Sequence, residues 1–342
     1  MAISNDLLSS TLFAIRDGEV DELYKKVAFL DGARKKGGVE TESGGIKLQR
    51  PLSLAEHSSI TQLATGYEPV SLAVNDVLRP AIYDWCDFVS PILVTKKEEL
   101  ENSGEYAIVK IVEARMKSVM GMLRRELNKQ ILVGSSSVLT SMNTLNGSIS
   151  STGFLEPELA SGTNQNNTVG GISKSAFPVP GWKNQAQDAA GIFKDNGLDA
   201  MNKIYIGANS VAPMGDISHI IGSEAFMSQY KKALFVNERF ISEKTLDGGR
   251  MALAFAGATV EADPALTGIT VNSTDFGASI PLSAYFLNYE GIKLVFHKDA
   301  DFAVSPFEYV SGTTARSAQL YVKCQLIADF LGGQGILTDA NA

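Results

Sequence analysis

The chain has 342 residues, of which 44% are hydrophobic and 20% charged, and this composition is that of a globular protein with room for two or three packed units. The formal net charge of −8 argues against a protein whose main task is to grip nucleic acid, although a container whose inner wall merely tolerates DNA stays open. No apolar run approaches the roughly 18 residues of a membrane span, and no basic residue precedes the mildly apolar N-terminal stretch, so neither a membrane helix nor a signal peptide is expected.

Residues 1–38 hold two short helical patterns. The first covers residues 7–15, and the second covers residues 20–30. The tract DGARKKGG at 31–38 follows and is predicted to be flexible and polar. Neither pattern has a partner nearby in the sequence, so each helix is expected to dock on something else.

Residues 44–80 change to extended patterns. The run GGIKLQRPLSL alternates apolar residues around Pro51, and a proline confines a strand to an edge or a bulge because it lacks an N–H group. A second extended run goes from Tyr67 to Leu78. Together they predict a long two-stranded hairpin, which is marginally stable alone in water and needs a surface to lie on.

A strand over 81–95 is predicted to lead into a helix over 96–133. Thr95 and Glu98 have the spacing of a capping box, and Gly134 is predicted to end the helix as a C-terminal cap. Apolar residues recur at steps of three or four along one stripe: Ile108, Val112, Met116, Val119, Leu123, Leu127 and Ile131.

The length of this helix bears on the shape of the molecule. At 1.5 Å per residue it would span roughly 57 Å, whereas a compact sphere of this chain length is about 50 Å across. Either the protein is flat and extended, or the helix breaks near Gly104 or Gly121.

The middle of the chain, residues 135–310, is predicted to form a second unit. The part from Asn143 to Gly181 is rich in Ser, Thr, Asn and Gly, which predicts surface loops. The remaining expected elements are helices at 185–206 and 222–234, two strands meeting near Gly257 with a turn at Asp263-Pro264, and two strands around Glu290-Gly291.

The C-terminal run from Ala318 to Leu331 alternates apolar residues with period two, which predicts a strand with one buried face under the long helix. Cys324 occupies a core position of that strand. Cys86 is the second cysteine, far away in the sequence and without a Cys-x-x-Cys partner, so the pair is interpreted as two reduced thiols rather than a disulfide or a metal site.

No residue is assigned a catalytic, cofactor-binding or metal-binding role. The sequence has no dinucleotide-binding glycine motif, P-loop, His-Glu-x-x-His or Gly-x-Ser-x-Gly. The three histidines are interpreted as surface or satisfied, partly buried rings: His57, His219 and His297. Two charged clusters are interpreted as a solvated first helical turn and as a solvated or inter-subunit face: Glu98, Glu99 and Glu101, and Arg124, Arg125 and Lys129.

Five segments follow one another in a characteristic order. They are GGIKLQRPL (44–52), FVSPILVTKKEELENSG (88–104), TVGGI followed by Trp182-Lys183-Asn184, GGRMALAFAGATVEADP (248–264) and YFLNYEGIKLVFH (285–297). With these segments the chain resembles a tailed-bacteriophage major capsid protein of the Hong Kong 97-type fold, over essentially its whole length.

The resemblance implies an α+β fold in four parts. These are an N-terminal arm (1–43), an extended E-loop hairpin (44–80), a peripheral domain (81–134 and 298–342) with a spine helix at about 96–133, and an axial domain (135–297). A flat shell subunit would explain a helix that crosses the molecule. The hairpin would lie across a neighbouring subunit, and the arm helices would dock on another copy or on a scaffolding partner.

The resemblance also implies the function. Such a chain is a structural head protein of the virion and not an enzyme, made in the bacterial host cytoplasm, with no cofactor and no membrane. Hexamers and pentamers of it form an icosahedral shell around double-stranded DNA, bound without sequence specificity, together with portal and scaffolding or cement proteins.

Some members of this fold crosslink an E-loop lysine covalently to an asparagine of a neighbour. Lys47 is the only lysine in the predicted hairpin and lies near its base, so no such crosslinking is expected. Three other functions remain: an encapsulin-type shell around a protein cargo, a tail-tube protein, and a cytosolic enzyme without a recognisable motif.

Overall fold

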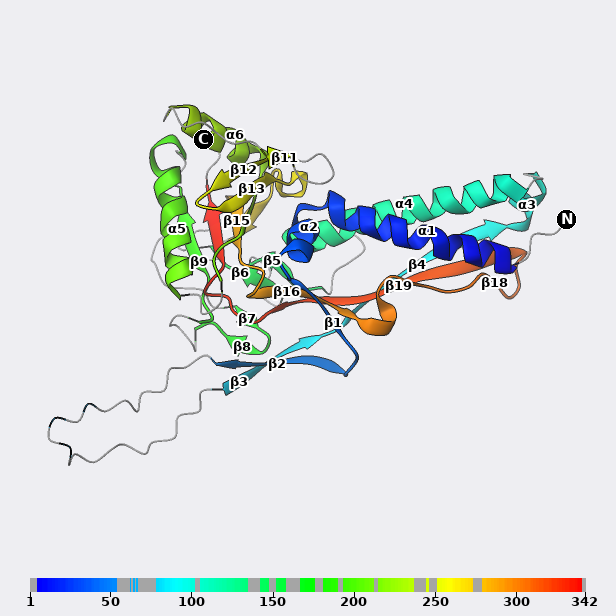
Figure 1. The fold of residues 1–342 in the computed structure, drawn as a ribbon, viewed down its shortest axis with the longest axis horizontal. Coiled ribbons are helices and arrows are strands. Elements are labelled where there is room, and N and C mark those ends of the chain that lie inside the picture. The colour runs from blue at the N-terminus through cyan, green and yellow to red at the C-terminus, as the bar shows by residue number, and fades with distance from the viewer. Residues whose placement is uncertain are drawn as a thin grey trace.

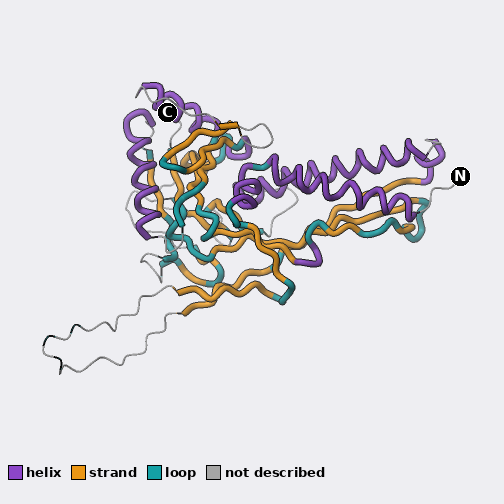
Figure 2. The backbone as a smooth tube through the Cα atoms, in the orientation of Figure 1, coloured by secondary structure: helices purple, strands orange, loops and turns teal. Residues whose placement is uncertain are grey.

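The computed structural model is an α+β molecule with two main sheets. It describes residues 5–53, 62, 64, 66, 78–101, 105–134, 142–147, 152–157, 167–175, 181–189, 193–211, 215–236, 244–245, 251–272 and 279–339. Figures 1 and 2 show an elongated shape, in which a long arm of helices over paired strands extends from a more compact body. No helix within these ranges is long and apolar enough to cross a membrane.

The arm is built on a six-stranded sheet. Its strands are β1 (Val39–Glu42), β4 (Cys86–Thr95), β16 (Ile292–His297), β17 (Ala303–Val304), β18 (Glu308–Tyr309) and β19 (Ala315–Ala328). β19 is central: one edge pairs with β4, and the other pairs with β18, β17 and β16 in turn. The predicted alternation is confirmed from Ala318 to Cys324, where every second residue is buried, but Gln325 to Ala328 are all buried, so the end of the strand has two buried faces.

The long helix is described as α3 (Lys96–Glu101) and α4 (Glu105–Leu132), and residues 102–104 lie outside the described part. α4 runs unbroken through Gly121, so a break there is excluded. Its 28 residues span about 42 Å along one face of the β4–β19 pair. The elongated shape in Figure 1 therefore follows from a helix that lies lengthwise on a long strand pair.

Both predicted caps of this helical segment are confirmed. The Thr95 N–H donates to Glu98 Oε2 at 3.0 Å, and the Glu98 N–H donates to Thr95 Oγ1 at 3.4 Å, which is the reciprocal capping box. At the other end Gly134 has a φ of +77°, and its N–H donates to the carbonyl of Gln130. A residue with a Cβ would be strained in that left-handed conformation.

The N-terminal helices end at places other than predicted. α1 (Asn5–Lys26) is one helix through both predicted patterns, and α2 (Ala28–Lys35) follows it. α1 lies along α4, with Leu12 and Leu23 buried (Figure 1). The partner that this helix lacks nearby in the sequence is therefore α4, a distant segment of the same chain, while docking on another copy or on a scaffold stays a prediction.

The tract 31–38 is also not the flexible segment that its composition predicts. It is helical to Lys35, and Gly32 lies so close to the body that a Cβ there would stand 2.5 Å from His219 Nδ1 and from the Tyr289 hydroxyl. Asp31 is buried and pairs with Lys35 at 3.0 Å. Gly32 and Gly38 therefore serve close packing against Tyr289, whereas Gly37, at a φ of +76°, has open space around it.

The body is an eight-stranded sheet with two helices, α5 (Leu198–Val211) and α6 (Glu224–Val236). Its order is β11-β12-β13-β10-β15-β20-β9, with β14 also on β15. The strands are β9 (Gln185–Asp188), β10 (His219–Gly222), β11 (Lys244–Thr245), β12 (Met251–Phe255), β13 (Ala258–Ala262), β14 (Thr270–Asn272), β15 (Ser279–Leu287) and β20 (Gly335–Thr338). The two strands predicted to meet near Gly257 are confirmed as the pair β12–β13, and the helix at 222–234 is confirmed as α6. The two strands predicted around Glu290-Gly291 are confirmed as β15 and β16, which lie in different sheets.

Two predictions in the middle of the chain are wrong. The helical pattern at 185–206 begins as strand β9, which pairs in parallel with β20, and only after a π-helical turn at Phe193–Gly197 does α5 follow. The supposed surface loops of 143–181 include four short strands: β5 (Thr144–Asn146), β6 (Gly153–Leu155), β7 (Thr168–Val169) and β8 (Ile172–Ser173). β5 and β6 are buried throughout, because they fill the space between α4 and the body.

A two-stranded ribbon leaves the junction of arm and body. It consists of β2 (Lys47–Ser53) and β3 (Leu78–Asp84), in which Pro51 lies opposite Pro80, so the predicted edge position of Pro51 is confirmed. The rest of the run 67–78, like His57, lies outside the described residues. The single strand predicted over 81–95 is wrong, because β3 pairs with β2 whereas β4 pairs with β19, and the chain changes partner at Trp85.

Candidate assembly surfaces

The ribbon β2–β3 has one face on the body and one face in solvent. Its inner side chains Leu48 and Tyr83 are buried, and the Tyr83 hydroxyl donates to the Ala328 carbonyl at 2.8 Å. The outward positions nearest the tip form a contiguous apolar patch, here named the ribbon face: Pro51, Leu78, Pro80 and Ile82. Contiguous exposed apolar patches mark interaction sites more often than single exposed residues do.

Ion pairs hold the base of this ribbon to the arm sheet. Arg50 pairs with Glu40 and, at 2.9 Å, with Glu42, and Lys293 reaches Glu40 at 2.6 Å and Asp329 at 3.2 Å. Partial burial works to raise the pKa of Glu40, but the Lys293 hydrogen bond and the Arg50 charge outweigh it and hold that pKa below its usual range. The ribbon is thus fastened to the arm sheet by the ion pairs of Arg50 with Glu40 and Glu42.

The side of β4 turned away from α4 carries a second apolar patch. Val89 and Leu93 are 55% and 46% exposed, and Pro91 lies between them on the same side of the strand. Tyr321 of β19 lies opposite Val89 in register. These four residues, here named the outer stripe, form a continuous apolar band on a β-sheet face that the chain itself leaves open to solvent.

A cleft of about 340 Å³ opens beside the outer stripe, between β4 and α4. Its walls are mainly apolar, with Met122 of α4 43% exposed at its mouth and Glu126 as its one ionisable side chain among the described residues. Leu123 and Leu320 form its floor from the helix and the central strand. The cleft and the stripe together give the arm an uncovered apolar edge.

The outer edge of β4 is closed to pairing over its second half. The Lys96 N–H bonds to the carbonyl of Thr314, just before β19, so the backbone polar groups of Thr95, Leu93 and Pro91 face the free edge. Glu98 accepts the Thr95 N–H, Arg115 donates to the Leu93 carbonyl, and Pro91 has no N–H to offer. Blocked edges of this kind prevent unwanted strand addition.

Glu98 connects the capping box to this edge, and its role can be measured. The Thr95 N–H, the Arg115 guanidinium and the Thr95 hydroxyl all bond to its carboxylate and lower the pKa of Glu98 to about 2. A carboxylate whose folded-state pKa lies below its unfolded value of 4.5 contributes stability above that value and loses it as the pH falls toward 2.

We expect Glu98→Ala to lower the free energy of unfolding by about 0.5–1 kcal/mol at pH 7, a modest effect because the group is well exposed to solvent. The difference from the parent chain should shrink between pH 4.5 and pH 2. Chemical denaturation at several pH values measures it, with Glu98→Gln as the control that keeps an acceptor for the cap. A difference that stayed constant across this window would contradict the assignment.

A fully buried lysine holds the β5–β8 region together. Lys174 Nζ lies 3.0 Å from Glu156 Oε2 and 3.0 Å from Asn184 Oδ1, and it also donates to the Phe154 carbonyl. The Glu156 carboxylate accepts the Asn167 N–H at 3.1 Å. Burial lowers the pKa of Lys174 to about 8, while the Glu156 charge acts in the opposite direction. We name Lys174, Glu156 and Asn184 the buried lysine cluster.

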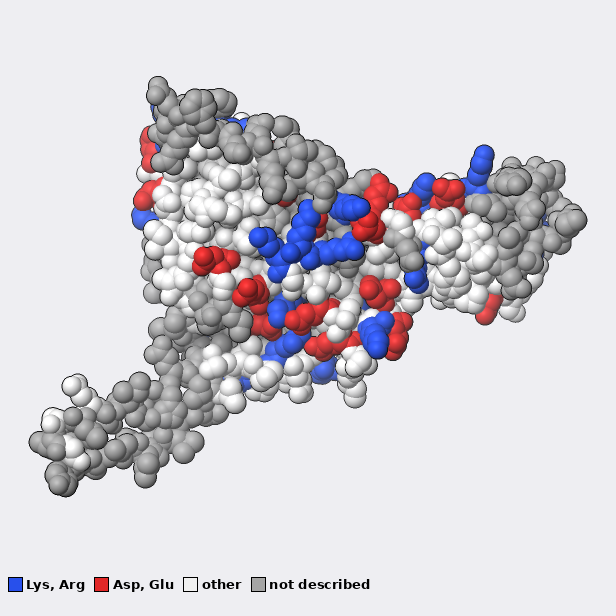
Figure 3. All heavy atoms as spheres, viewed as in Figure 1, with Lys and Arg blue, Asp and Glu red and all other residues white. Residues whose placement is uncertain are grey.

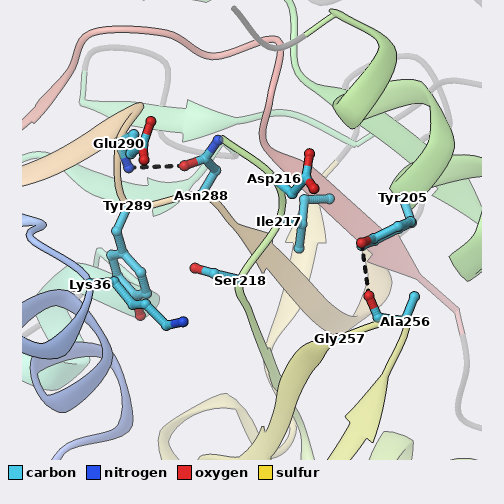
Figure 4. Close-up of a pocket in the computed structure, with 10 residues that line it drawn as sticks. All are labelled: Lys36, Tyr205, Asp216, Ile217, Ser218, Ala256, Gly257, Asn288, Tyr289 and Glu290. Carbon is cyan, nitrogen blue, oxygen red and sulfur yellow. Dashed lines mark hydrogen bonds between the residues drawn. The ribbon is translucent and has the colours of Figure 1, made fainter. Parts of the chain in front are cut away.

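The body also has a polar hollow of about 350 Å³ (Figure 4). Lys36, Asp216 and Glu290 line it, together with Tyr205, whose hydroxyl donates to the Ala256 carbonyl at 2.8 Å. Ser218 lies on its wall. Among the side chains drawn in Figure 4 the dashed hydrogen bonds join only Tyr205 to Ala256 and Asn288 to the backbone of Glu290, so no nucleophile is bonded to a base there.

The described histidines lie in separate places. The Nδ1 of His297 accepts the Asp299 N–H at 3.2 Å. His219 is fully rather than partly buried, with its Nδ1 2.7 Å from the Tyr289 hydroxyl and its Nε2 3.5 Å from Glu261 Oε1. Arg125 is exposed on α4. The described residues hold no group of three or more His, Cys, Asp or Glu side chains suited to a metal ion.

Charge on the visible face is mixed. Figure 3 shows acidic and basic side chains interspersed, with Lys and Arg gathered around α2, whose last turn contains Arg34 and Lys35. A nucleic-acid-binding surface needs a more continuous basic face than this one. The chemistry on this chain is therefore concentrated in apolar patches and buried polar clusters.

Comparison with known proteins yields matches in structure and none in sequence. No protein-family model and no curated protein sequence matches the chain. The capsid asymmetric unit of cyanophage A-1(L) is 15% identical, with a TM-score of 0.62 over 93% of this chain and 94% of that one. The capsid of the empty GTA particle is 10% identical, with a TM-score of 0.56 over 90% of both chains.

A holo-SrpI encapsulin complex from Synechococcus elongatus matches more weakly. It is 9% identical, with a TM-score of 0.50 over 90% of this chain and 88% of that one. At such identities a likeness establishes the fold and leaves the role of the chain to further argument. The α+β fold of this chain is that of the Hong Kong 97-type capsid proteins.

Proposed function

We propose that this chain is the major capsid protein of a tailed bacteriophage, which assembles as hexamers and pentamers into an icosahedral shell around double-stranded DNA. The observation that carries the proposal is the full-length likeness to a cyanophage capsid subunit, at a TM-score of 0.62 with more than nine-tenths of each chain covered. The likeness covers the arm sheet, the long helix and the body together, which supports a role for the whole subunit in a shell.

The exposed patches support a role in assembly. A shell is built from repeated contacts in which one surface of a subunit meets a different surface of its neighbour. The ribbon face, the outer stripe and the β4–α4 cleft are three apolar surfaces at different places on an elongated subunit. Each contact can be weak, because many contacts act together in a closed particle.

The expected layout makes residues 1–43 the N-terminal arm, 44–80 the E-loop, 81–134 with 298–342 the peripheral domain, and 135–297 the axial domain. Two strands depart from these bounds, because β16 (Ile292–His297) lies in the arm sheet and β20 (Gly335–Thr338) lies in the body sheet. The ribbon that carries the ribbon face would lie across a neighbouring subunit. Portal and scaffolding or cement proteins would complete the head, and the subunit would be made in the host cytoplasm and reside in the virion.

The proposal assigns no catalytic activity to the chain. In the polar hollow the Tyr205 hydroxyl donates to the Ala256 carbonyl and the Asn288 side chain accepts the Glu290 N–H, so both groups are engaged with the backbone. Covalent crosslinking is not expected either, since Lys47 forms an ion pair with Asp84 at 3.0 Å at the base of the ribbon. An encapsulin remains the second candidate because of the match to the SrpI shell.

Sedimentation of the recombinant chain, with negative-stain imaging of the fastest fraction, tests the proposal. We expect closed megadalton shells, either from the chain alone or after co-expression with a scaffolding protein. Shells that copurify with a specific protein cargo would favour the encapsulin. A chain that stays monomeric or forms small rings even with a scaffold would contradict both shell functions.

A further inference from the structure

The two cysteines, separated by most of the sequence, lie opposite each other in the arm sheet. Cys86 is the first residue of β4, and its register partner on β19 is Cys324. Both are free thiols and both are buried. We propose that Cys86 and Cys324 form an intramolecular disulfide in an oxidising medium, which ties the start of β4 to the central strand.

The backbone geometry suits such a bond. The Lys96 N–H bonds to the carbonyl of Thr314, and in an antiparallel ladder the hydrogen-bonded pairs recur at every second residue. Counting back along the unbroken register makes Cys86 and Cys324 a hydrogen-bonded pair, with a Cα separation of about 5.5 Å. Disulfides span Cα separations of about 4.4–6.8 Å and Cβ separations of about 3.5–4.5 Å. Because Cβ atoms of a hydrogen-bonded pair lie about 5.5 Å apart, the start of β4 must shift by about 1 Å toward β19 as the bond forms.

The side chains point the same way. Residues directly opposite in a sheet project from the same face, and here that face is the one that buries Ile92, Leu320 and Val322. The neighbouring charge of Cys86 is among the causes that raise the pKa of the Cys324 thiol, after burial itself. The two thiols therefore lie on one buried face of the sheet, with Asp87 and Asp301 adding to the causes that raise the pKa of Cys324.

The surroundings of Cys86 show what the bond would reinforce. Gln325 Nε2 donates to the Asp84 carbonyl at 2.7 Å and to Cys86 Sγ at 3.3 Å. Tyr83 bonds to Ala328 farther along β19. The point where the chain passes from the ribbon to β4 is thus already fastened to β19 by side-chain hydrogen bonds, and a disulfide would make this connection covalent.

The reaction needs an oxidant, for which a small disulfide such as oxidised glutathione suffices. The thiolate of Cys86, at the strand end, attacks one sulfur of the small disulfide and releases one glutathione thiolate. The thiolate of Cys324 then attacks Cys86 Sγ, which forms the new S–S bond and releases the second glutathione. Two protons leave the protein thiols, and one disulfide is exchanged for another.

Burial makes this exchange slow. It raises the pKa of Cys324, so little thiolate is present at neutral pH, and the start of β4 must open for an oxidant to enter. The bond closes a loop of more than two hundred residues. A crosslink over so long a loop is expected to raise the midpoint of thermal unfolding by about 5–8 °C.

The test uses the full chain, purified with reductant and then incubated with oxidised glutathione. Samples are denatured, alkylated and examined by intact mass and peptide mapping. We expect the mass to fall by two hydrogens, both thiols to resist alkylation, and one crosslinked peptide pair to contain Cys86 and Cys324. The midpoint of thermal unfolding should rise and return to its starting value on reduction.

Cys86→Ala and Cys324→Ala are the matched controls. Each should keep one alkylatable thiol or carry one glutathione, with no reversible rise in the unfolding midpoint. Retention of both thiols in the parent chain after prolonged oxidation would overturn the proposal. So would glutathione adducts on both cysteines, disulfide-linked dimers in place of the internal bond, or a bond that forms only in denaturant.

Discussion

Replacing Lys174 with methionine is expected to lower the free energy of unfolding by about 3–5 kcal/mol. The substitution removes the cation that lies 3.0 Å from Glu156 Oε2 and leaves a carboxylate in a largely buried site. Breaking one side of a buried pair costs far more than losing a surface pair, because the remaining charge is not compensated. Denaturant-induced unfolding of the unassembled chain measures the loss.

Two further variants distinguish this mechanism from a simple loss of packing. Lys174→Met combined with Glu156→Gln should recover most of the stability, since the double change removes both charges and keeps acceptors for the Asn167 N–H. Lys203→Met is the surface control, because Lys203 pairs with Asp199 in solvent. Equal losses in the Lys174 and Lys203 variants would refute the role of the buried lysine cluster.

The lowered pKa of Lys174 also makes the expected difference in the free energy of unfolding depend on pH. Because its folded-state pKa of about 8 lies below the unfolded value of 10.5, the unfolded chain binds more protons between these two values. The contribution of this residue to stability therefore rises with pH across that window. The parent chain should gain free energy of unfolding relative to Lys174→Met between pH 8 and pH 10.

Features determined by neighbouring residues were predictable from the sequence. The capping box of Thr95 and Glu98, the positive φ of Gly134 and the alternation of β19 depend on residues a few positions apart. Each is decided by backbone hydrogen bonding or by side-chain period alone. These local signals also sufficed to order the elements along an extended capsid-type subunit.

Features that depend on distant partners were not predictable. The Ser-, Thr- and Asn-rich segment 143–181 suggested loops, yet Thr144 Oγ1 donates to the Ile131 carbonyl and Asn146 Nδ2 to the Val133 carbonyl. These polar side chains are buried because they satisfy the end of α4. Strand β9 likewise forms only because β20, from the far end of the chain, pairs with it.

The candidate assembly surfaces also depend on distant partners and were not predictable from the sequence. Pro51 predicted an edge strand from the sequence alone. The outer stripe, in contrast, can be recognised only once β4 is paired with β19 and α4 covers one side of that pair. The mostly apolar run around Phe88 and Val89 could equally belong to a strand that is buried on both faces. The facing of Cys86 and Cys324 is a matter of register, which no local pattern specifies.

Val89→Asp is expected to abolish shell formation at concentrations where the parent chain assembles. Val89 is 55% exposed in the single chain, so a carboxylate there is solvated and the subunit still folds. In a contact that buries the outer stripe, the same carboxylate would lose its water and the valine its apolar contact. Burial of one such side chain contributes about 1.5–3 kcal/mol, or roughly 10–150-fold in each contact.

Repetition multiplies this loss. Every subunit of a closed shell makes the contact, so a penalty of even 10-fold in each should raise the threshold concentration for assembly by at least that factor. Sedimentation over a concentration series measures the threshold, and circular dichroism of the slow fraction verifies that the subunit is folded. Val89→Thr is the matched control, because threonine keeps the β-branched shape without a charge.

The position of the charge tests which surface is buried. Leu93 lies four residues after Val89 on the same face of β4. Leu93→Asp should therefore act as Val89→Asp does, because both residues belong to the outer stripe. Lys203→Asp, on the exposed side of α5, should leave the threshold within a few-fold of the parent value. Normal shells from both outer-stripe variants would mean that this band faces solvent in the particle, and the ribbon face and the β4–α4 cleft would then have to supply the contacts between subunits.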